Sequence, residues 1–330
     1  MKETTNVSIG SQYNLNIGHA SVAQKGNVGK KYIYALQLRN QQAETFVLRG
    51  TPGSSISNPI LHLTGTAAGH TQTWEYSGIA NNWFIGVKPN KDLKPWAKQI
   101  ARINIKTMGV AHSSNTAFPR IAYLNLAGYP EDRCTGAQMK RAEAAVSPKY
   151  HNFLIATVEY DGTGHFAIYD MGLINDALTA AGTGFINLGD FQCEESFTIH
   201  NLIGASGLMN SIQGYDLDDL GNIYITSQKA PVFDEKTGKY TAHHKEIIKI
   251  PWNFRTDTSN WGNVNLSAWK GIDISGKHSE VEGIQILGPD HAYVTVAYHA
   301  KSKIKKPTKK DKNYKNKTVL NMIYELSWTF

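Results

Sequence analysis

Five Gln and Glu residues recur along the chain, each leading a short alternating segment. They are spaced at intervals of 48, 71, 70 and 69 residues and are Gln24, Gln72, Glu143, Gln213 and Glu282. If the segments are equivalent strands around one axis, these side chains converge there, and converging polar groups with nearby aromatic rings suit a sugar or another polyhydroxylated ligand. We therefore predict a ligand-binding ring that consists of His70, Gln72, Trp74, Glu143, Gln213, His278, Glu280 and Glu282. His19 and Gln24 are further candidates.

Two other interpretations of these polar residues stay open. Polar side chains at strand starts often only satisfy buried backbone groups and bound water. Alternatively, glycoside hydrolysis needs two opposed carboxyl groups, and Glu143, Glu282 and Asp216 come from different segments that could face one another. The mixture of three Gln and two Glu favours hydrogen bonding over acid–base chemistry, so we predict no catalytic residue.

The elements that must position this ring are β-hairpins. The stretch 278–299 holds two runs of alternating apolar residues, separated by the turn residues Gly288, Pro289 and Asp290. Four similar pairs of runs lie upstream, within 19–38, 70–87, 141–159 and 210–228. A single hairpin cannot bury its own apolar face, so five regularly spaced units indicate radial repetition.

Each unit continues into a third strand, predicted at 44–49, 99–105, 165–169, 246–250 and 321–327. The last unit lacks a fourth strand, whereas 6–15 supplies a spare one that can close the ring. We predict an all-β, five-bladed β-propeller closed by the N-terminal strand, with a β-sandwich pair or a β-helix as alternatives. The chain would form one domain, with blades at 17–66, 67–140, 141–205, 206–270 and 271–330 plus 5–16.

Composition adds few constraints except in one segment. The 330 residues are 41% hydrophobic, without an apolar run of transmembrane length or a signal-peptide core at the N-terminus. Residues 301–317 carry nine of the 34 basic residues and one of the 27 acidic ones, which leaves 25 basic against 26 acidic residues elsewhere. We expect an inserted loop that is either a solvated surface or a polyanion-binding element, through Lys303, Lys305, Lys306, Lys309 and Lys310. Nucleic acid is not an expected partner, since Tyr314 is the only aromatic residue there.

No metal or cofactor site is predicted. The stretch 216–222 resembles half of a calcium loop, but Leu220 stands at a ligand position, and a tight turn explains it more simply. His243 and His244 lack partners at zinc spacing. Cys134 and Cys193 allow at most one disulfide, and we expect free thiols.

Seven segments are more specific than strand periodicity: 69–75 (GHTQTWE), 83–89 (WFIGVKP), 142–148 (AEAAVSP), 210–217 (NSIQGYDL), 227–231 (SQKAP), 277–282 (KHSEVE) and 323–328 (IYELSW). Through them, and over nearly its whole length, the sequence resembles the helveticin J family, the class III bacteriocins of lactobacilli. The resemblance implies a secreted protein that kills related Gram-positive bacteria, and it brings no catalytic residues. We expect it to bind cell-envelope glycan or teichoic acid without an enzymatic step. A glycan hydrolase and a lectin-like adhesion factor are the alternatives.

Overall fold

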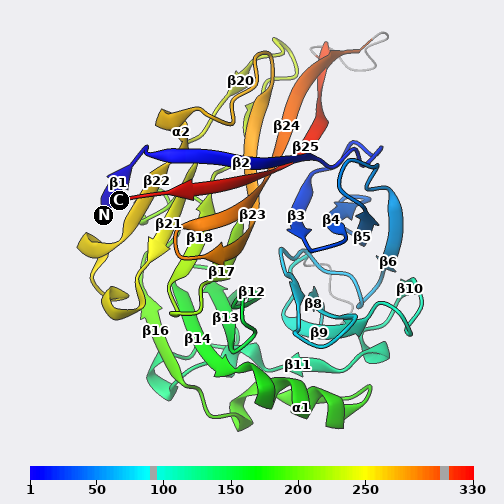
Figure 1. Cartoon of the computed structure of the whole chain (residues 1–330), viewed down its shortest axis with the longest axis vertical. Helices are drawn as coiled ribbons and strands as arrows, with labels where there is room; N and C mark the ends of the chain where they lie inside the picture. Colours follow the sequence, from blue (N-terminus) through cyan, green and yellow to red (C-terminus); the bar gives the residue numbers. More distant parts are fainter. Residues whose placement is uncertain (90–94, 305–311) are drawn as a thin grey trace.

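The computed structural model describes residues 1–89, 95–304 and 312–330, and its strands form five sheets around one axis (Figure 1). The predicted five-bladed β-propeller, closed by the N-terminal strand, is confirmed. Within each blade, consecutive strands pair antiparallel from the axis outward. The alternating sequences therefore bury both faces of each sheet against neighbouring blades.

The strands of the blades follow the order of the chain. Blade 1 contains β3 (Ala23–Val28), β4 (Ile33–Arg39), β5 (Glu44–Gly50) and β6 (Asn58–Leu63). Blade 2 contains β7 (Trp74–Tyr76), β8 (Asn82–Val87), β9 (Gln99–Asn104) and β11 (Arg120–Ala122). Blade 3 contains β12 (Met139–Val146), β13 (Asn152–Glu159), β14 (Gly164–Asp170) and β16 (Glu195–Ile199). Blade 4 contains β17 (Gly214–Leu217), β18 (Ile223–Ser227), β21 (Glu246–Ile250) and β22 (Gly262–Asn265).

Blade 5 closes the ring with strands from both ends of the chain. It contains β23 (His278–Gly288), β24 (His291–Lys303), β25 (Tyr314–Trp328) and, on its outer edge, β2 (Val7–Asn14). Strand β2 pairs antiparallel with β25, from Val7 opposite Trp328 to Asn14 opposite Met322. The two termini consequently lie side by side (Figure 1).

Three blades also gain a fifth strand from a segment that belongs elsewhere in the sequence. These short strands pair parallel with the outer strands of blades 1, 2 and 4, and are β10 (Ala111–His112), β15 (Phe185–Asn187) and β1 (Lys2–Thr4). Each covers an outer sheet edge that would otherwise present unpaired backbone groups. Sequence reasoning predicted none of them, because strands this short show no period.

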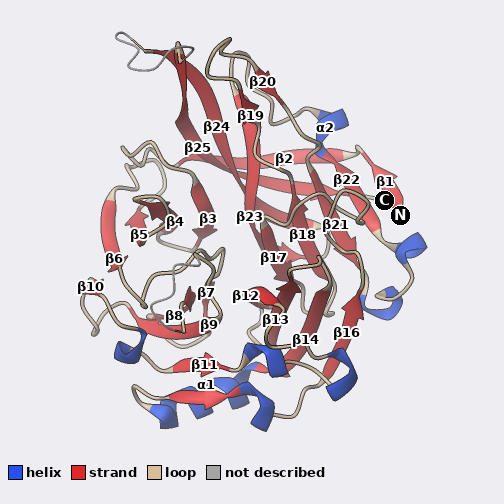
Figure 2. Ribbon diagram, turned by 180° about the vertical axis from the view of Figure 1, so that it is seen from behind, coloured by secondary structure: helices blue, strands red, loops and turns tan. Residues whose placement is uncertain are grey.

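Helices are few and lie outside the blades (Figure 2). They are α1 (Met171–Ala181), α2 (Leu266–Trp269), and the 3₁₀ helices η1 (Asn115–Ala117), η2 (Leu124–Leu126), η3 (Pro130–Asp132), η4 (Leu188–Asp190), η5 (Trp252–Phe254) and η6 (Thr258–Asn260). Helix α1 begins at the N-cap Asp170, whose side chain accepts from the Leu173 N–H. Arg102 of blade 2 donates to the Asn175 carbonyl of α1 at 2.7 Å, which ties the helix to the neighbouring blade.

The structure of the lysine-rich segment differs from the inserted loop that the sequence predicted. Instead of a plain loop over 301–317, the ladder of β24 and β25 continues to Lys303 opposite Tyr314. The register of this ladder shifts between Tyr298 and His299, where the strands leave the blade, and the pairing then continues to the end of both strands. A second hairpin, β19 (Val232–Phe233) with β20 (Tyr240–Thr241), packs beside it, and the Asn313 and Tyr314 N–H groups both donate to the Glu235 carbonyl. We call these two hairpins the arm.

Candidate functional site

The inner strands of the five blades place two rings of side chains along the axis. The first ring consists of the predicted residues Gln24, Gln72, Glu143, Gln213 and Glu282. Three residues further along each inner strand lies a second ring, consisting of Asn27, Glu75, Val146, Asp216 and Gln285. A cavity opens beside each ring, of about 330 Å³ at the first and about 510 Å³ at the second. The molecule thus has two separate mouths on one axis.

A layer of small residues and one lysine separates the two rings. A Cβ on Gly283 would lie 2.7 Å from the Gln24 carbonyl oxygen and 2.9 Å from the Lys25 side chain. A Cβ on Gly214 would lie 2.7 Å from the Gly283 Cα. Only glycine permits this approach of backbones at the axis. Lys25 fills the remaining space and is 1% exposed.

In the first ring, Glu143 is fully engaged by hydrogen bonds. One of its carboxylate oxygens accepts from the Thr71 hydroxyl at 2.9 Å, the Gln72 N–H at 3.0 Å and the Thr73 hydroxyl at 2.6 Å. The other accepts from the Arg141 guanidinium at 3.0 Å. These bonds join blades 2 and 3, and they leave Glu143 without a free oxygen for a ligand or a proton transfer.

Gln72 links the rest of the first ring. Its carbonyl accepts from Arg141 at 2.7 Å, and its amide donates to Gln213 at 3.1 Å and to Glu282 at 3.5 Å. Burial raises the pKa of Glu282 well above its ordinary value, the neighbouring Glu280 raises it in the same direction, and Gln72 and Arg141 oppose the shift. Gln72 thus bonds to two other ring members, and Arg141 joins it to Glu143.

His70 borders the cavity at this mouth. Its ring packs against Trp96 at a tilt of 31°, with ring centroids 4.1 Å apart, and its Nδ1 lies 2.8 Å from the Gln42 side-chain oxygen. Burial, with a smaller effect of Arg141, lowers the pKa of His70 to about 3, so this imidazole is neutral at ordinary pH. Glu280 also lines the cavity, where it accepts from His299 Nε2 at 2.8 Å.

Two of the predicted ring residues lie elsewhere. Trp74 is 0% exposed and stacks on Trp83, with ring centroids 4.7 Å apart, inside the core between blades 1 and 2. A fully buried indole presents no face to a ligand at the axis. His278 stacks on Tyr240 of the arm, with ring centroids 4.0 Å apart, beside a different cavity that Lys245 and Asp273 also line.

In the second ring, the two carboxyl groups are held by an ammonium and by backbone N–H groups. The Lys25 ammonium donates to the Glu75 carboxyl, and the two side chains are 1% and 5% exposed. Asp216 accepts from the Leu217 N–H at 2.8 Å and from the Ile286 N–H at 2.6 Å. Burial of this kind is tolerated because each carboxyl has a charged or backbone donor.

Burial also raises the pKa values of these two carboxyl groups to different extents. It raises the pKa of Glu75 to about 8, against the opposing effect of Lys25, and the pKa of Asp216 to about 6, again opposed by Lys25. Burial alone would lower the pKa of Lys25, but Glu75 and Asp216 raise it above its ordinary value. Burial therefore opposes ionisation of both carboxyl groups, whereas the Lys25 ammonium favours it.

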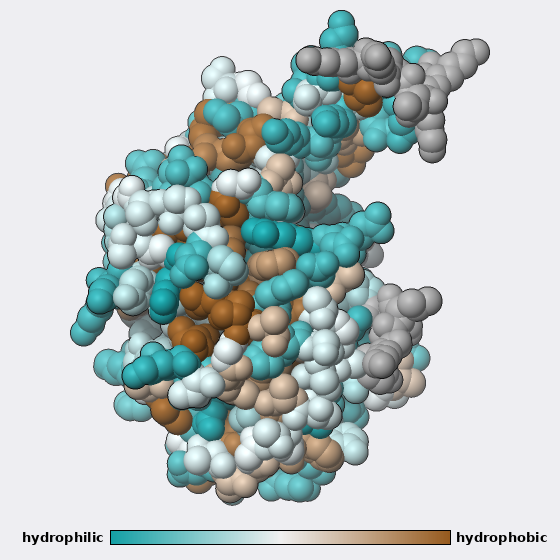
Figure 3. Space-filling model, turned by 90° about the vertical axis from the view of Figure 1, so that its right-hand side faces the viewer, coloured by the Kyte–Doolittle hydropathy of each residue, from teal (hydrophilic) through white to brown (hydrophobic). Residues whose placement is uncertain are grey.

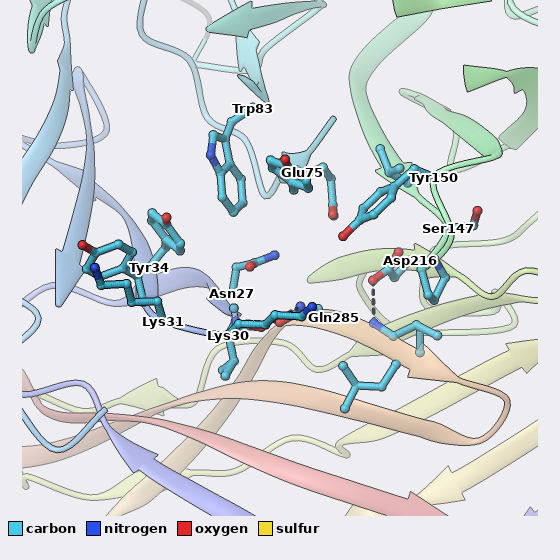
Figure 4. A pocket seen from close by; sticks show the side chains of 18 residues that line it. Asn27, Lys30, Lys31, Tyr34, Glu75, Trp83, Ser147, Tyr150, Asp216 and Gln285 are labelled. Carbon is cyan, nitrogen blue, oxygen red and sulfur yellow. Dashed lines mark hydrogen bonds between the residues drawn. The ribbon is translucent and has the colours of Figure 1, made fainter. Parts of the chain in front are cut away.

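Aromatic side chains from three blades form the wall above this floor. Tyr34, Trp83 and Tyr150 line the cavity with Glu75 and Asp216, and Figure 4 shows Glu75 between Trp83 and Tyr150. The Tyr34 and Trp83 rings are 4.6 Å apart, whereas Tyr150 is 43% exposed at the rim. Flat apolar faces above convergent polar groups suit the alternating apolar and hydroxyl faces of a sugar ring.

Sequence reasoning missed the second ring, although a signal for it exists. Four of the five positions three residues after the first ring are polar: Asn27, Glu75, Asp216 and Gln285. Lys25 and Glu75 are, in addition, charged residues inside otherwise buried strands. The wall could not be found in this way, since Tyr34, Trp83 and Tyr150 meet only after the blades pack.

The predicted polyanion site is described only in part. Lys303 is exposed at the end of β24, while Lys305, Lys306, Lys309 and Lys310 lie outside the described residues. The arm stands clear of the body, and the part of its surface that is coloured in Figure 3 is largely hydrophilic. Within the described ranges, no helix combines the length and apolar character needed to cross a membrane.

Comparison with known proteins finds one family model and one relative that match nearly the whole chain. The family model described as "Bacteriocin helveticin-J" matches residues 3–329. Bacteriocin helveticin-J of Lactobacillus helveticus is 52% identical over 345 aligned positions, which cover 99% of each chain.

Similar solved structures are far more distant. A GH43_1 enzyme from Xanthomonas citri, in complex with xylose, is 9% identical with a TM-score of 0.42, covering 94% of this chain and 89% of its own. A putative 6-phosphogluconolactonase from Bacteroides fragilis is 12% identical with a TM-score of 0.38, covering 88% and 85%. Similarity at this level carries no inference about chemistry.

Proposed function

The chain belongs to the helveticin J family of bacteriocins, and from this premise we propose that it is a secreted antibacterial protein that binds a cell-envelope glycan of related Gram-positive bacteria at the second-ring mouth. The observation that carries the proposal is the cavity of about 510 Å³ with an aromatic wall above Glu75 and Asp216. Its size and its mixture of flat apolar faces with a few polar groups are typical of sites for small polar ligands.

The first-ring mouth is the less suitable of the two for a sugar. Its amide and carboxyl groups are engaged with one another, so a ligand would have to displace bonds already made. At the second ring, Glu75 lines the cavity with Asn27 and Gln285, and Tyr150 offers an exposed ring.

Tyr150 provides a direct test with a matched control. Loss of one aromatic face in Tyr150→Ala should weaken binding to purified cell walls by about three- to tenfold, measured by sedimentation of protein with walls. Tyr123→Ala is the control, because Tyr123 shares both the high exposure (52% against 43%) and the positive φ (56° against 61°) and lies away from this cavity. Equal binding by both variants would contradict the assignment of the site.

One observation also favours the second candidate function, a glycan hydrolase. Two carboxyl groups with different pKa values at one site are the arrangement that acid–base hydrolysis requires, and here the pKa of Glu75 (about 8) lies above that of Asp216 (about 6). Glu75→Gln separates the two functions. A binding protein should keep its killing activity in this variant, whereas a hydrolase should lose both killing and the release of reducing sugar from walls while still binding them.

The arm is proposed to add electrostatic attachment to an anionic polymer such as teichoic acid. Four lysines are exposed along β24 and β25 in the arm: Lys301, Lys303, Lys315 and Lys317. Their positive charge is concentrated at one place, whereas the rest of the chain is close to neutral. Attraction of this kind is screened over about 8 Å at physiological salt, so it acts on approach and weakens as salt rises.

A charge-matched comparison tests the arm. Replacing Lys303, Lys305, Lys306, Lys309 and Lys310 with Gln should remove the salt dependence of attachment to cells and leave Tm nearly unchanged. The control replaces five lysines that are exposed elsewhere, Lys2, Lys106, Lys149, Lys229 and Lys270. If both variants lose the salt dependence equally, net charge rather than the arm is responsible.

A further inference from the structure

A sulfur, a nitrogen and an oxygen ligand converge at the end of the hairpin formed by β13 and β14. Cys134 lies in the segment before β12, Glu159 ends β13 and His165 lies in β14. One potential ligand atom from each lies within 4.8 Å of the other two. Cys134 and His165 are 5% and 7% exposed, so the group is largely sealed from solvent.

The hydrogen bonds of His165 define how its ring is oriented. Its Nδ1 lies 2.7 Å from the backbone carbonyl oxygen of Asp132, which can only accept, so Nδ1 carries a hydrogen. In the neutral ring, Nε2 then presents a lone pair to a Glu159 carboxylate oxygen at 3.1 Å. Two acceptors at this distance require either a proton or a metal cation between them.

A buried hydroxyl, that of Thr157, lies beside the Cys134 thiol. Thr157 is 1% exposed and pairs with His165 across the hairpin, and its hydroxyl oxygen has no hydrogen-bond partner. A thiolate bound to a metal would accept from this hydroxyl, and the displaced thiol proton would pass to solvent.

We propose that Cys134, Glu159 and His165 bind one divalent cation of the zinc class. A thiolate, an imidazole and a carboxylate are the ligands that zinc uses, and a carbonyl partner on the other imidazole nitrogen is the usual outer-shell arrangement. Bond lengths of about 2.0–2.3 Å require only small side-chain movements from the present positions. Three protein ligands leave one coordination position for water.

Such an ion would connect the segment before β12 to the hairpin of β13 and β14. Cys134 precedes β12, the strand that carries Arg141 and Glu143, whereas Glu159 and His165 belong to the adjacent hairpin. Fixing these segments together would hold the start of β12 in register. The ion would therefore stabilise blade 3 independently of any glycan bound at the second ring.

The test uses the full-length protein, stripped with a chelator and then titrated with Zn²⁺ or Co²⁺ alone. We expect one metal ion per chain, a rise in Tm of several degrees, and with Co²⁺ a near-ultraviolet thiolate-to-cobalt charge-transfer band. Cys134→Ser and His165→Ala should lose the band and the Tm shift, and Thr157→Val should weaken the affinity by about tenfold. Cys193→Ser is the matched control, because Cys193 is also a buried free thiol (6% exposed) but lies outside the group.

The wild-type spectrum keeps the proposal falsifiable even if a variant fails to fold, since the charge-transfer band reports thiolate ligation directly. No band and no Tm shift in the wild-type protein would overturn the proposal and leave a proton between His165 and Glu159. A band that Cys134→Ser retains, or that Cys193→Ser loses, would overturn the assignment of the ligands.

Discussion

The two rings on the propeller axis are built from the same five strands and only three residues apart, yet they differ in how their polar groups are satisfied. In the first ring, the Gln72 amide and the Arg141 guanidinium bond to neighbouring side chains, and Glu143 accepts four hydrogen bonds. In the second, two buried carboxyl groups flank one ammonium beside an open cavity. The first ring joins neighbouring blades, whereas the second ring borders the cavity that is the candidate ligand-binding site.

The difference shows that polar residues at equivalent positions of a repeat need not share a role. A ring of amides and carboxylates can saturate its own hydrogen bonds, because an amide both donates and accepts. A buried pair of carboxyl groups cannot, and it needs a cation, backbone N–H groups or a ligand. Lys25 and the Ile286 N–H supply the first two here, and the proposed glycan supplies the third.

The largest expected effect comes from removing the cation of the second ring. Lys25→Met should lower the free energy of unfolding by about 3–5 kcal/mol at neutral pH, because it leaves buried carboxyl groups without their charged partner. Urea denaturation measures the loss. Lys30→Met, at an exposed position of the same mouth, should change stability by less than about 0.5 kcal/mol. A Lys25→Met protein as stable as wild type would show that the second ring is not held by charge.

A smaller effect is expected at the first ring. Glu143→Gln places an amide where four donors converge and should cost about 1–3 kcal/mol of unfolding free energy. Antibacterial activity should remain once the protein is folded, since Glu143 has no free oxygen for chemistry. Glu131→Gln, at an exposed position, is the control for loss of a carboxylate. Killing activity lost from a folded Glu143→Gln protein would transfer the active role to the first ring.

A third expected effect is a pH dependence of stability. The pKa of Glu75 is about 8 in the folded chain and lies near its ordinary value of 4.5 when unfolded, so the folded state binds an extra proton between these values. Stability from this group is complete below about pH 4.5 and is lost as pH rises through 8, with a slope of at most about 1.4 kcal/mol per pH unit. Glu75→Gln should flatten the decline of Tm between pH 5 and 8. An unchanged profile would mean that Glu75 does not hold this proton.

Much of the architecture could be predicted from the sequence. Alternating runs and the recurring Gln or Glu residues defined five blades and their inner strands, and the spare segment at 6–15 indicated the closure that β2 makes with β25. The fifth strands β10, β15 and β1 could not be found, since two or three residues have no detectable period. The prediction of an inserted loop over 301–317 was wrong at both ends of this segment, where β24 and β25 continue to Lys303 and Tyr314. Lysines that alternate with polar residues can continue a strand.

The candidate site was less accessible to sequence reasoning. Alternation shows that a residue leads an inner strand, but it does not show whether its partners satisfy it. Trp74 was expected near the axis, whereas its place one residue before Glu75 turns it into the core between blades. Cys134, Glu159 and His165 have no motif spacing, since a hairpin and a preceding segment bring them together.

Hydrogen exchange in the presence of soluble cell-wall glycan fragments tests the central claim most directly, because it locates the occupied mouth. The account predicts protection of backbone amides in 27–34, 146–150 and 285–287, around the second ring, without change in 140–142 and 211–213 at the first. Protection confined to the first-ring peptides would contradict it.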